Sequence, residues 1–294
     1  MARYISDKHL KAYQKGGVLN KLFETIKEDP ELSFEIRQNN EAMVYYRKDK
    51  ILTIKLDDKG KLTITKLSDG YYKGGEKTLS QYFDEEHIKH NLICKTEMRA
   101  YFKEAKKLVY VLKPGAEFNI QQNIALGNHS LTDRNRYLVV DMEWQYSQSG
   151  IQKPHLPKTR IDLIIVDLEK NHDGYNDIYL AELKLGLGAT KGDSGTIGHV
   201  NKTSEIINSQ RACDSLFEDV DSIIKQKIEL GLIEGTKMDF HFGAKPKMML
   251  ILAYRGENEL KQLELEYEKA KEEALRIGMG EPKCIMYNAF PELK

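Results

Sequence analysis

The chain has 294 residues, enough for one large domain or two modest ones with a full hydrophobic core. Hydrophobic residues make up 40% of it and charged residues 31%, which excludes collagen-like and grossly disordered proteins. Lys and Arg total 45, as do Asp and Glu, so the formal net charge is zero. Any nucleic-acid binding must therefore depend on a local basic patch rather than on a global positive field.

The sequence carries no signal for a membrane or for secretion. No run of about 18 apolar residues is present, and residues 1–13 lack the apolar segment of a secretory signal. The three cysteines, Cys94, Cys213 and Cys284, are odd in number and far apart, so they fit neither a disulfide framework nor a metal clip. We therefore expect a reduced, cytoplasmic protein that does not bind membranes.

The first 85 residues have the pattern of a small α+β module. A polar helix is predicted over residues 7–27, followed by a β-meander of short alternating or β-branched runs with turn residues between them. The predicted strands cover residues 32–37, 42–46, 51–56 and 62–65. The Gly-rich segment 70–75 is the candidate break, and the domains are taken as residues 1–85 and 86–294. Such a module either packs on the main domain as a small sheet or docks a substrate or partner.

From residue 86 onward, predicted helices and strands alternate, which favours an α/β sheet covered on both faces. The predicted helices cover residues 87–112, 204–230 and 257–276. The predicted strands cover residues 137–146, 159–168, 177–185, 247–254 and 283–287. A turn-rich stretch at 147–157 and a turn at 171–174 join the first three strands, and a Gly-rich loop at 186–198 follows the third.

Two of these predicted strands carry charges where a core strand should have none. Glu182 and Lys184 share one face of an apolar strand, and Asp162 interrupts the apolar run of the strand before it. A charge in a central strand is costly unless it is paired or coordinated. If the two strands form a hairpin, Asp162 lies level with Glu182. The two carboxylates, with the carbonyl of Leu183, could then hold Mg²⁺ beside a lysine. The alternative to a metal site is a buried ion pair between Glu182 and Lys184 with an unrelated Asp162.

The spacing of these residues resembles the motif of the PD-(D/E)XK nuclease superfamily. Asp162 is followed, after nineteen residues, by Glu182-Leu183-Lys184 on the next predicted strand. The resemblance covers about residues 86–254, and Ile161 stands where the family name has Pro. It implies a restriction-endonuclease-like αβββαβ core, with a mixed sheet flanked by helices, and leaves the small N-terminal α+β module outside the core. It also implies a metal-dependent nuclease that hydrolyses phosphodiester bonds, with DNA as the expected substrate, by a metal-activated water.

The resemblance also assigns roles to single residues. It implies that Asp162 and Glu182 hold Mg²⁺, for which Mn²⁺ would substitute, and that Lys184 acts on the attacking water or on the transition state. The family often adds an acid from its first helix or first strand, and Glu143 is the first choice for it here. The next choices lie on the helix predicted at residues 87–112: Glu97 and Glu104.

Candidate phosphate contacts lie after the third of these strands. The loop at 186–192 could bring Lys191, Lys202 and backbone N–H groups to a nucleic-acid phosphate, although a flexible connection is equally consistent with it. Gln210 loosely matches a Gln that several branches of the family place on the helix after the third strand, and it fits a solvated position equally well. His199, next to the loop, could reach the site, although a surface histidine is the preferred interpretation. The best local basic stripe lies on the helix predicted at residues 87–112: Lys95, Arg99, Lys103, Lys106 and Lys107.

Two further functions stay open from the sequence. One is a catalytically inactive member of the same fold that binds nucleic acid or protein. The other is a nucleotide-binding enzyme that uses the Gly-rich loop and Lys191, although the loop has the spacing of neither a dinucleotide fingerprint nor a P-loop. The expected partner is nucleic acid, in the first place DNA, and a homodimer is compatible with the sequence.

Overall fold

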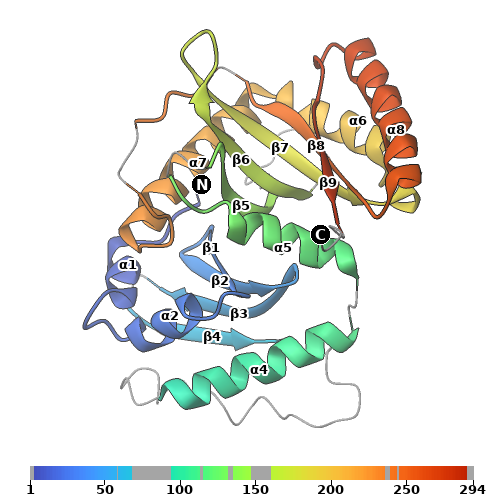
Figure 1. Ribbon diagram of the computed structural model, residues 1–294. Coiled ribbons are helices and arrows are strands. Elements are labelled where there is room, and N and C mark those ends of the chain that lie inside the picture. The colour runs from blue at the N-terminus through green and yellow to red at the C-terminus, as the bar shows by residue number, and fades with distance from the viewer. Residues whose placement is uncertain are drawn as a thin grey trace. The chain divides into compact units, whose positions relative to one another are not determined.

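The computed structural model is a mixed α/β protein with two β-sheets (Figure 1). It describes residues 3–57, 59–67, 94–112, 115–131, 135–146, 160–235, 239–243 and 245–289. The chain divides into two compact units: unit 1 comprises Met1–His129 and Asp221–Lys237, and unit 2 comprises Ser130–Val220 and Met238–Lys294. None of the helices in the described ranges is long and apolar enough to cross a membrane.

Unit 1 is built on the predicted β-meander. Its four strands are antiparallel and lie in chain order: β1 (Ser33–Arg37), β2 (Glu41–Tyr46), β3 (Asp49–Leu56) and β4 (Leu62–Lys66). Asn39 and Asn40 form the turn between β1 and β2 with φ angles of 60° and 61°, a left-handed conformation that Asn adopts more readily than most residues. The four strands predicted from alternation are thereby confirmed.

The helices of unit 1 differ from the prediction in two ways. They are α1 (Asp7–Tyr13), α2 (Asn20–Lys27), α4 (Lys95–Leu112), α5 (Ala116–Gly127) and the C-terminal part of α7 (Gln210–Glu229). The single helix expected over residues 7–27 is wrong, because the chain turns at Gly16 and Gly17. A Cβ atom at Gly17 would lie 2.3 Å from the carbonyl oxygen of Ala12. The second difference is α5, which the sequence pattern did not predict.

Helix α4 packs on the sheet of unit 1, against α2 and β3 (Figure 1). The side chain of Tyr101 is fully buried, and its hydroxyl donates to the carbonyl of Ile51 and accepts the N–H of Leu67. Helices α4 and α5 therefore group with unit 1, although the sequence places them in the second domain. The predicted boundary between residues 85 and 86, the Gly-rich break at 70–75 and the start of the helix predicted at 87–112 lie outside the described residues.

A buried histidine stabilises the start of unit 1 only in its neutral form. His9 is fully buried, its Nε2 lies 2.9 Å from the hydroxyl of Tyr13, and its Nδ1 lies 3.3 Å from Oδ1 of Asn40. A neutral ring with the proton on Nδ1 can donate to Asn40 and accept from Tyr13. Burial lowers the pKa of His9 from 6.5 to about 4, while the hydrogen bond with Asn40 partly opposes this change.

We expect His9 to make unit 1 less stable as the pH falls below 6.5. The unfolded chain takes up a proton there that the folded chain binds only near pH 4, so stability is lost between these two values. Between pH 7.5 and pH 5 the wild type should lose about 2 kcal/mol more than His9→Gln, in which nothing titrates at this position. Urea denaturation followed by circular dichroism at both pH values measures the difference. Equal losses in the two proteins would contradict the assignment.

Unit 2 contains a five-stranded mixed sheet in the order β5-β6-β7-β8-β9. The strands are β5 (Tyr137–Gln145), β6 (Arg160–Lys170), β7 (Asn176–Leu185), β8 (Lys247–Tyr254) and β9 (Lys283–Asn288). Strands β5, β6 and β7 pair antiparallel, whereas β8 runs parallel to β7 and β9 runs parallel to β8. The five strands predicted in this part of the chain are confirmed, and β7 is the central one. The turn-rich stretch predicted at 147–157 lies outside the described residues.

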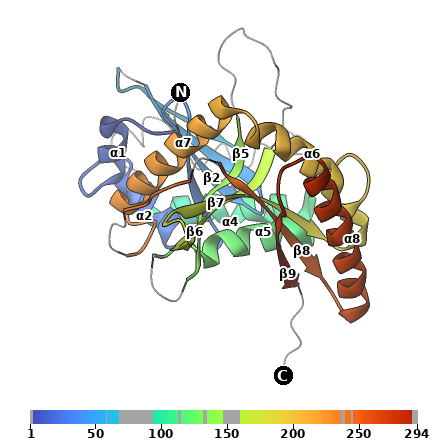
Figure 2. The ribbon, with the colours of Figure 1, turned by 90° about the horizontal axis from the view of Figure 1, so that it is seen from above.

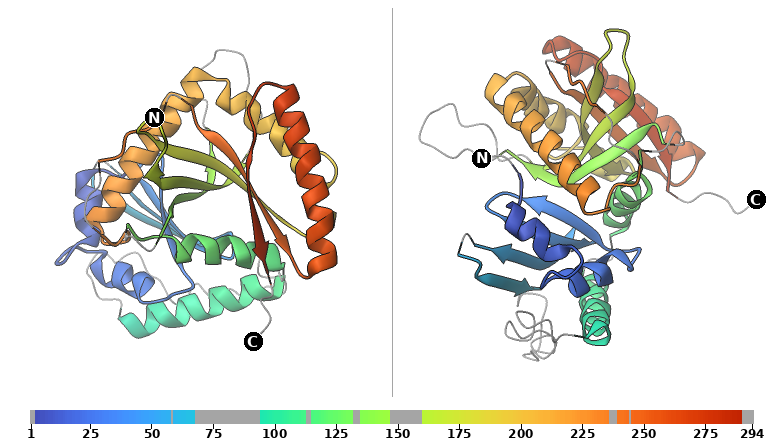
Figure 3. Two further views of the ribbon diagram at one scale, coloured as in Figure 1. Left: turned by 45° about the horizontal axis from the view of Figure 1, so that its top comes forward. Right: turned by 90° about the vertical axis from the view of Figure 1, so that its left-hand side faces the viewer.

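The helical segments of unit 2 are η2 (Leu187–Thr190), α6 (Thr196–Ile207), the first part of α7 and α8 (Glu257–Arg276). Helices α6 and α8 lie side by side and contact β8 (Figures 2 and 3). The single helix predicted over residues 204–230 is wrong, because α6 ends at Ile207 and α7 begins at Gln210. Between them, the hydroxyl of Ser209 accepts the N–H of Ala212 at 3.3 Å, the capping role that Ser favours at the start of a helix.

Candidate functional site

The hairpin of β6 and β7 brings Asp162 level with Glu182. Leu163 pairs with Ala181, so the same register one residue further along places Asp162 opposite Glu182. Directly opposed residues point to the same face of a sheet. Both side chains are buried, and Oδ2 of Asp162 accepts the N–H of Leu183 at 3.0 Å. The hairpin expected between the two strands is therefore present, its pairing ends at Leu163 and Ala181, and the roles given to Asp162 and Glu182 stay predictions.

A third carboxylate, that of Glu143, falls in the same row from the neighbouring strand β5. The β5–β6 pairs on either side place Glu143 beside Asp162: Met142 with Leu163, and Trp144 with Ile161. Glu143 has a φ of 57°, a conformation that non-glycine residues seldom adopt within a strand. Its side chain is buried, and its Oε2 accepts a hydrogen bond from Nη1 of Arg160 at 3.0 Å. Three buried carboxylates thus occupy one row across β5, β6 and β7.

Two cationic or titratable groups contact the carboxylate of Glu182. Nζ of Lys184, on the same strand, lies 3.8 Å from Oε2 of Glu182, and both side chains are buried. Nδ1 of His199, on α6, lies 3.0 Å from the same oxygen. The expectation that His199 is a surface residue is wrong, because α6 begins at Thr196, eight residues before the predicted start, and brings this side chain against β7. Its only signal in the sequence is its place just after the loop that follows the charged strand.

The Gly-rich loop holds the start of α6 in place by close packing. A Cβ atom at Gly195 would lie 2.2 Å from the carbonyl oxygen of Thr190. Thr190 itself is buried, and its hydroxyl donates to the carbonyl of Leu187 at 2.8 Å. This close backbone approach accounts for a glycine at position 195 without any bound phosphate.

We expect Gly195→Ala to destabilise unit 2 by about 1–3 kcal/mol, because the added methyl group must push the backbone of the loop away from α6. Gly188→Ala is the matched control, since nothing lies within 4 Å of a Cβ atom at that position. Thermal unfolding of both variants measures the difference. If Gly195→Ala melts at the temperature of Gly188→Ala, the close approach does not hold α6.

Residues predicted to contact phosphate lie in several places after β7. Lys191 is exposed at the end of η2. Nζ of Lys202 donates to the carbonyl of Asp193 at 2.9 Å, and Nε2 of Gln210 donates to Oδ1 of Asp214 on its own helix at 2.8 Å. The contacts described for Lys202 and Gln210 are therefore local, and nucleic-acid binding by these three residues stays a prediction. Two other predicted acids lie on α4 of unit 1: Glu97 and Glu104.

The donor atoms of the site fit a hard cation better than a soft one. Asp162 and Glu182 offer carboxylate oxygens, the ligands that Mg²⁺ prefers, and Leu183 offers a backbone carbonyl between the charged residues of β7. Within the described ranges, no group of three or more His, Cys, Asp or Glu side chains is placed to hold a metal ion. Glu143, Asp162, Glu182 and His199 all lie within these ranges, so they do not form such a group, and a metal held by Asp162 and Glu182 alone would need the carbonyl of Leu183 and water as further ligands.

The two cysteines of unit 2 do not offer a reactive thiolate at neutral pH. Burial raises the pKa of Cys213, and it raises the pKa of Cys284 to about 11. A thiol is a good nucleophile or metal ligand only as the thiolate. The candidate reactive groups of unit 2 are therefore its buried carboxylates and Lys184.

Comparisons of the chain with protein-family models, with curated protein sequences and with solved structures give no significant match. The function must then follow from what the residues of the site can do. Lys184 and His199 contact Glu182, and the strand registers place Asp162 and Glu143 at the neighbouring positions of β6 and β5. Carboxylates can hold a cation, and a lysine can place a positive charge beside a bound phosphate.

Proposed function

We propose that the protein is a Mg²⁺-dependent nuclease that hydrolyses phosphodiester bonds, with DNA as its expected substrate. The observation that carries this proposal is the row in which Asp162 stands level with Glu182, while Nζ of Lys184 lies 3.8 Å from Glu182. All three side chains are buried in a sheet whose other positions are largely apolar. This is the arrangement that the motif predicts when its two strands form a hairpin.

A purely structural role explains less of this arrangement. Replacing buried charges by apolar residues of similar volume often leaves stability unchanged or raises it, so a stable sheet does not need them. Structural ion pairs would account for Glu182 with Lys184 and for Glu143 with Arg160. They would not account for Asp162 at the neighbouring position of β6.

The proposed reaction gives definite tasks to Asp162, Glu182, Lys184 and His199. Asp162 and Glu182 would hold Mg²⁺, with the carbonyl of Leu183 as a further oxygen donor. Mn²⁺ would substitute for Mg²⁺. The bound ion would supply charge neutralisation at the phosphate and a more acidic water. Lys184 donates a hydrogen bond to the attacking water or to a phosphate oxygen, and its charge offsets the negative charge that develops in the transition state. His199 orients the carboxylate of Glu182 through the contact at 3.0 Å.

We further propose that unit 2 contains a restriction-endonuclease-like core. The order of its elements supports this: an antiparallel β5-β6-β7 meander, then α6, then β8 parallel to β7. The helix expected to open the core, predicted at residues 87–112, groups with unit 1 instead. A reduced, cytoplasmic environment goes with this proposal, since the free cysteines Cys94, Cys213 and Cys284 need no oxidant.

The proposal is tested with a panel of nucleic acids: linear and circular duplex DNA, single strands, branched DNA and RNA. The purified chain is incubated with Mg²⁺ or Mn²⁺ and, in parallel, with a chelator. Cleavage that needs the metal is the expected result, and the preferred substrate then defines the specificity. Binding without cleavage of any substrate would favour the catalytically inactive member of the fold. Saturable ATP or GTP binding that depends on Lys191 and not on Glu182 would favour a nucleotide-binding enzyme.

A further inference from the structure

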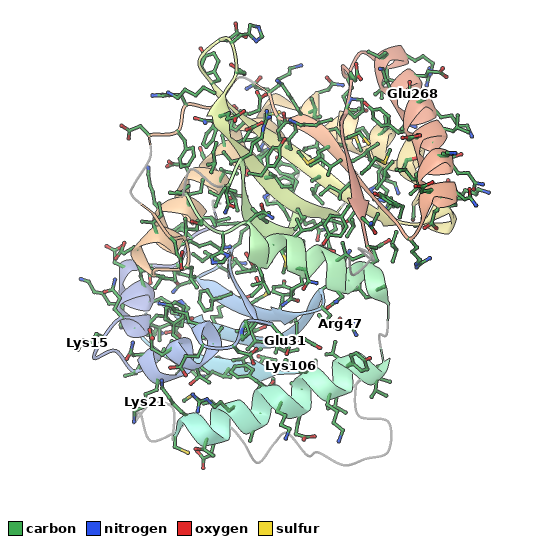
Figure 4. The ribbon with its side chains drawn as sticks, viewed as in Figure 1. Lys15, Lys21, Glu31, Arg47, Lys106 and Glu268 are labelled. Carbon is green, nitrogen blue, oxygen red and sulfur yellow. The ribbon has the colours of Figure 1, made fainter. Side chains whose placement is uncertain are left out.

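Cations lie over aromatic rings at one surface of unit 1, formed by the β2–β3 turn, the C-terminal half of α4 and the start of α5. We call this set the cation–aromatic surface. Figure 4 labels two of its cations, Arg47 and Lys106, near α4 and α5. Its pairs, with the distance from cation to ring centroid, are Arg47 over Tyr110 at 4.8 Å, Lys48 over Phe118 at 5.7 Å and Lys106 over Tyr46 at 5.9 Å.

Arg47 is the least satisfied cation of this surface. Its side chain is only 7% exposed, and its Nε and Nη1 atoms have no hydrogen-bond partner among the described residues. Its backbone N–H, by contrast, donates to the side chain of Gln122. A buried guanidinium with two unpaired nitrogens is costly, and such groups in folded proteins are normally completed by water, an ion or a ligand. A ligand with anionic oxygens would supply such an acceptor.

The turn that carries Arg47 and Lys48 does not have the residues that are usual in a two-residue hairpin turn. The two residues have φ angles of 50° and 70°, so both are left-handed. A two-residue hairpin turn of this kind favours Asn and Gly, because a side chain in the left-handed region is strained. Two long cationic side chains are thus held side by side despite an unfavourable backbone.

The ring beside Arg47 is open to solvent on the surface of α4. Tyr110 is 58% exposed, and Lys107 and Lys103, one and two turns before it, are exposed as well. Lys106 is different, because its ammonium group is neutralised by salt bridges at 2.8 Å and 2.7 Å, to Asp29 and Glu31. The positive charge available to a ligand therefore comes from the turn and from the outer face of α4.

We propose that the cation–aromatic surface binds single-stranded nucleic acid. Arg47 and Lys48 contact backbone phosphates, and the exposed ring of Tyr110 stacks on an unpaired base. Proteins that bind single strands combine a positively charged surface with aromatic stacking in this way. An acidic peptide would satisfy the cations but would leave Tyr110 without a stacking partner. The proposal does not depend on cleavage by unit 2, since a strand can bind here whether or not it is cut.

The test measures the fluorescence anisotropy of a labelled 20-nucleotide single strand of mixed sequence, and of its duplex, as the full chain is added. Both titrations are done in the presence of a chelator. We expect the single strand to bind more tightly than the duplex. Tyr110→Ala should weaken its binding about tenfold, whereas Tyr110→Phe, which keeps the ring, should bind like the wild type. Since these measurements exclude divalent metal and the cleavage assays require it, the two proposals can fail separately.

The salt dependence of binding tests whether Arg47 and Lys48 contact phosphates. Arg47→Met and Lys48→Met should each reduce the slope of log Kd against log salt by about 0.7, the value for one phosphate contact to a single strand. Lys15→Met is the matched control, because Lys15 is exposed on unit 1 well away from this surface (Figure 4). An unchanged Kd for the single strand in Tyr110→Ala would overturn the proposal. It would also be overturned if Tyr110→Ala weakened duplex binding as much as single-strand binding, or if Lys15→Met changed the slope as much as Arg47→Met and Lys48→Met do. Because Tyr110 is exposed, its substitution tests the surface even if Arg47→Met folds poorly.

Discussion

Replacing Glu182 by Gln is expected to reduce metal-dependent cleavage at least about a hundredfold while the protein stays folded. Gln has nearly the shape of Glu but lacks the charge that a divalent cation requires from its ligand. Lys184→Met should have an effect of the same order. It keeps the apolar part of the side chain and removes the positive charge that lies 3.8 Å from Glu182.

The same hairpin provides matched controls at its other end. Glu169→Gln and Lys170→Met change the same residue types at exposed positions near the β6–β7 turn, and both should cleave like the wild type. Initial rates with Mg²⁺ and melting temperatures are measured for all variants after identical purification. Cleavage that survives in both Glu182→Gln and Lys184→Met would mean that these residues do not carry the reaction.

Metal binding gives a readout that does not depend on catalysis. Titration calorimetry with Mg²⁺ or Mn²⁺ should show binding to the wild type and to Glu169→Gln, and a large loss of affinity in Glu182→Gln. Asp162→Asn should lose affinity as well, since it removes the other predicted ligand. Equal affinities in all these proteins would place the metal elsewhere, even if cleavage were metal-dependent.

Removing the buried lysine of α7 should destabilise unit 1 by about 3–5 kcal/mol. Nζ of Lys227 lies 2.8 Å from Oε2 of Glu35, both side chains are buried, and the hydroxyl of Ser33 donates to the other oxygen of Glu35. In Lys227→Met the carboxylate stays buried without its countercharge, which costs far more than the pair itself contributes. Urea denaturation of the variant and of the wild type measures the loss.

A double-mutant cycle separates this ion pair from general packing. Glu35→Gln combined with Lys227→Met removes both charges, so the double variant should recover most of the stability that Lys227→Met loses. Lys225→Met is the control on the same helix, since Lys225 forms an exposed salt bridge to Asp221 at 2.5 Å and should change stability by less than about 1 kcal/mol. If the effects of the two substitutions at positions 35 and 227 simply add, the buried pair is not coupled.

The sequence by itself determined the strands. Alternation and β-branched runs indicate which face of a strand is buried. The pairing within the central hairpin was not set by its turn alone, because the register shifts between Val166 and Lys170: Lys170 pairs with Asn176, whereas Val166 pairs with Ile178. The charges on otherwise apolar strands were equally visible, because a buried charge conflicts with its own local pattern.

The ends of the helices, and the contacts that depend on them, were decided by the tertiary structure. Periodicity does not show that the chain turns at Gly17, or that α6 begins at Thr196, because both depend on how closely two backbone segments approach. The contact of His199 with Glu182 follows from that start of α6, whereas the sequence shows only that His199 lies next to the loop after the charged strand.

The grouping of distant segments into units depended on the tertiary structure in the same way. The C-terminal part of α7 belongs to unit 1, where Lys227 meets Glu35 across 192 positions of sequence. The pairing of Arg47 with Tyr110 likewise joins a hairpin turn to a helix much later in the chain. Local sequence reports burial and the pairing of adjacent strands, whereas contacts between distant segments are set by packing over the whole unit, which no short window of sequence records.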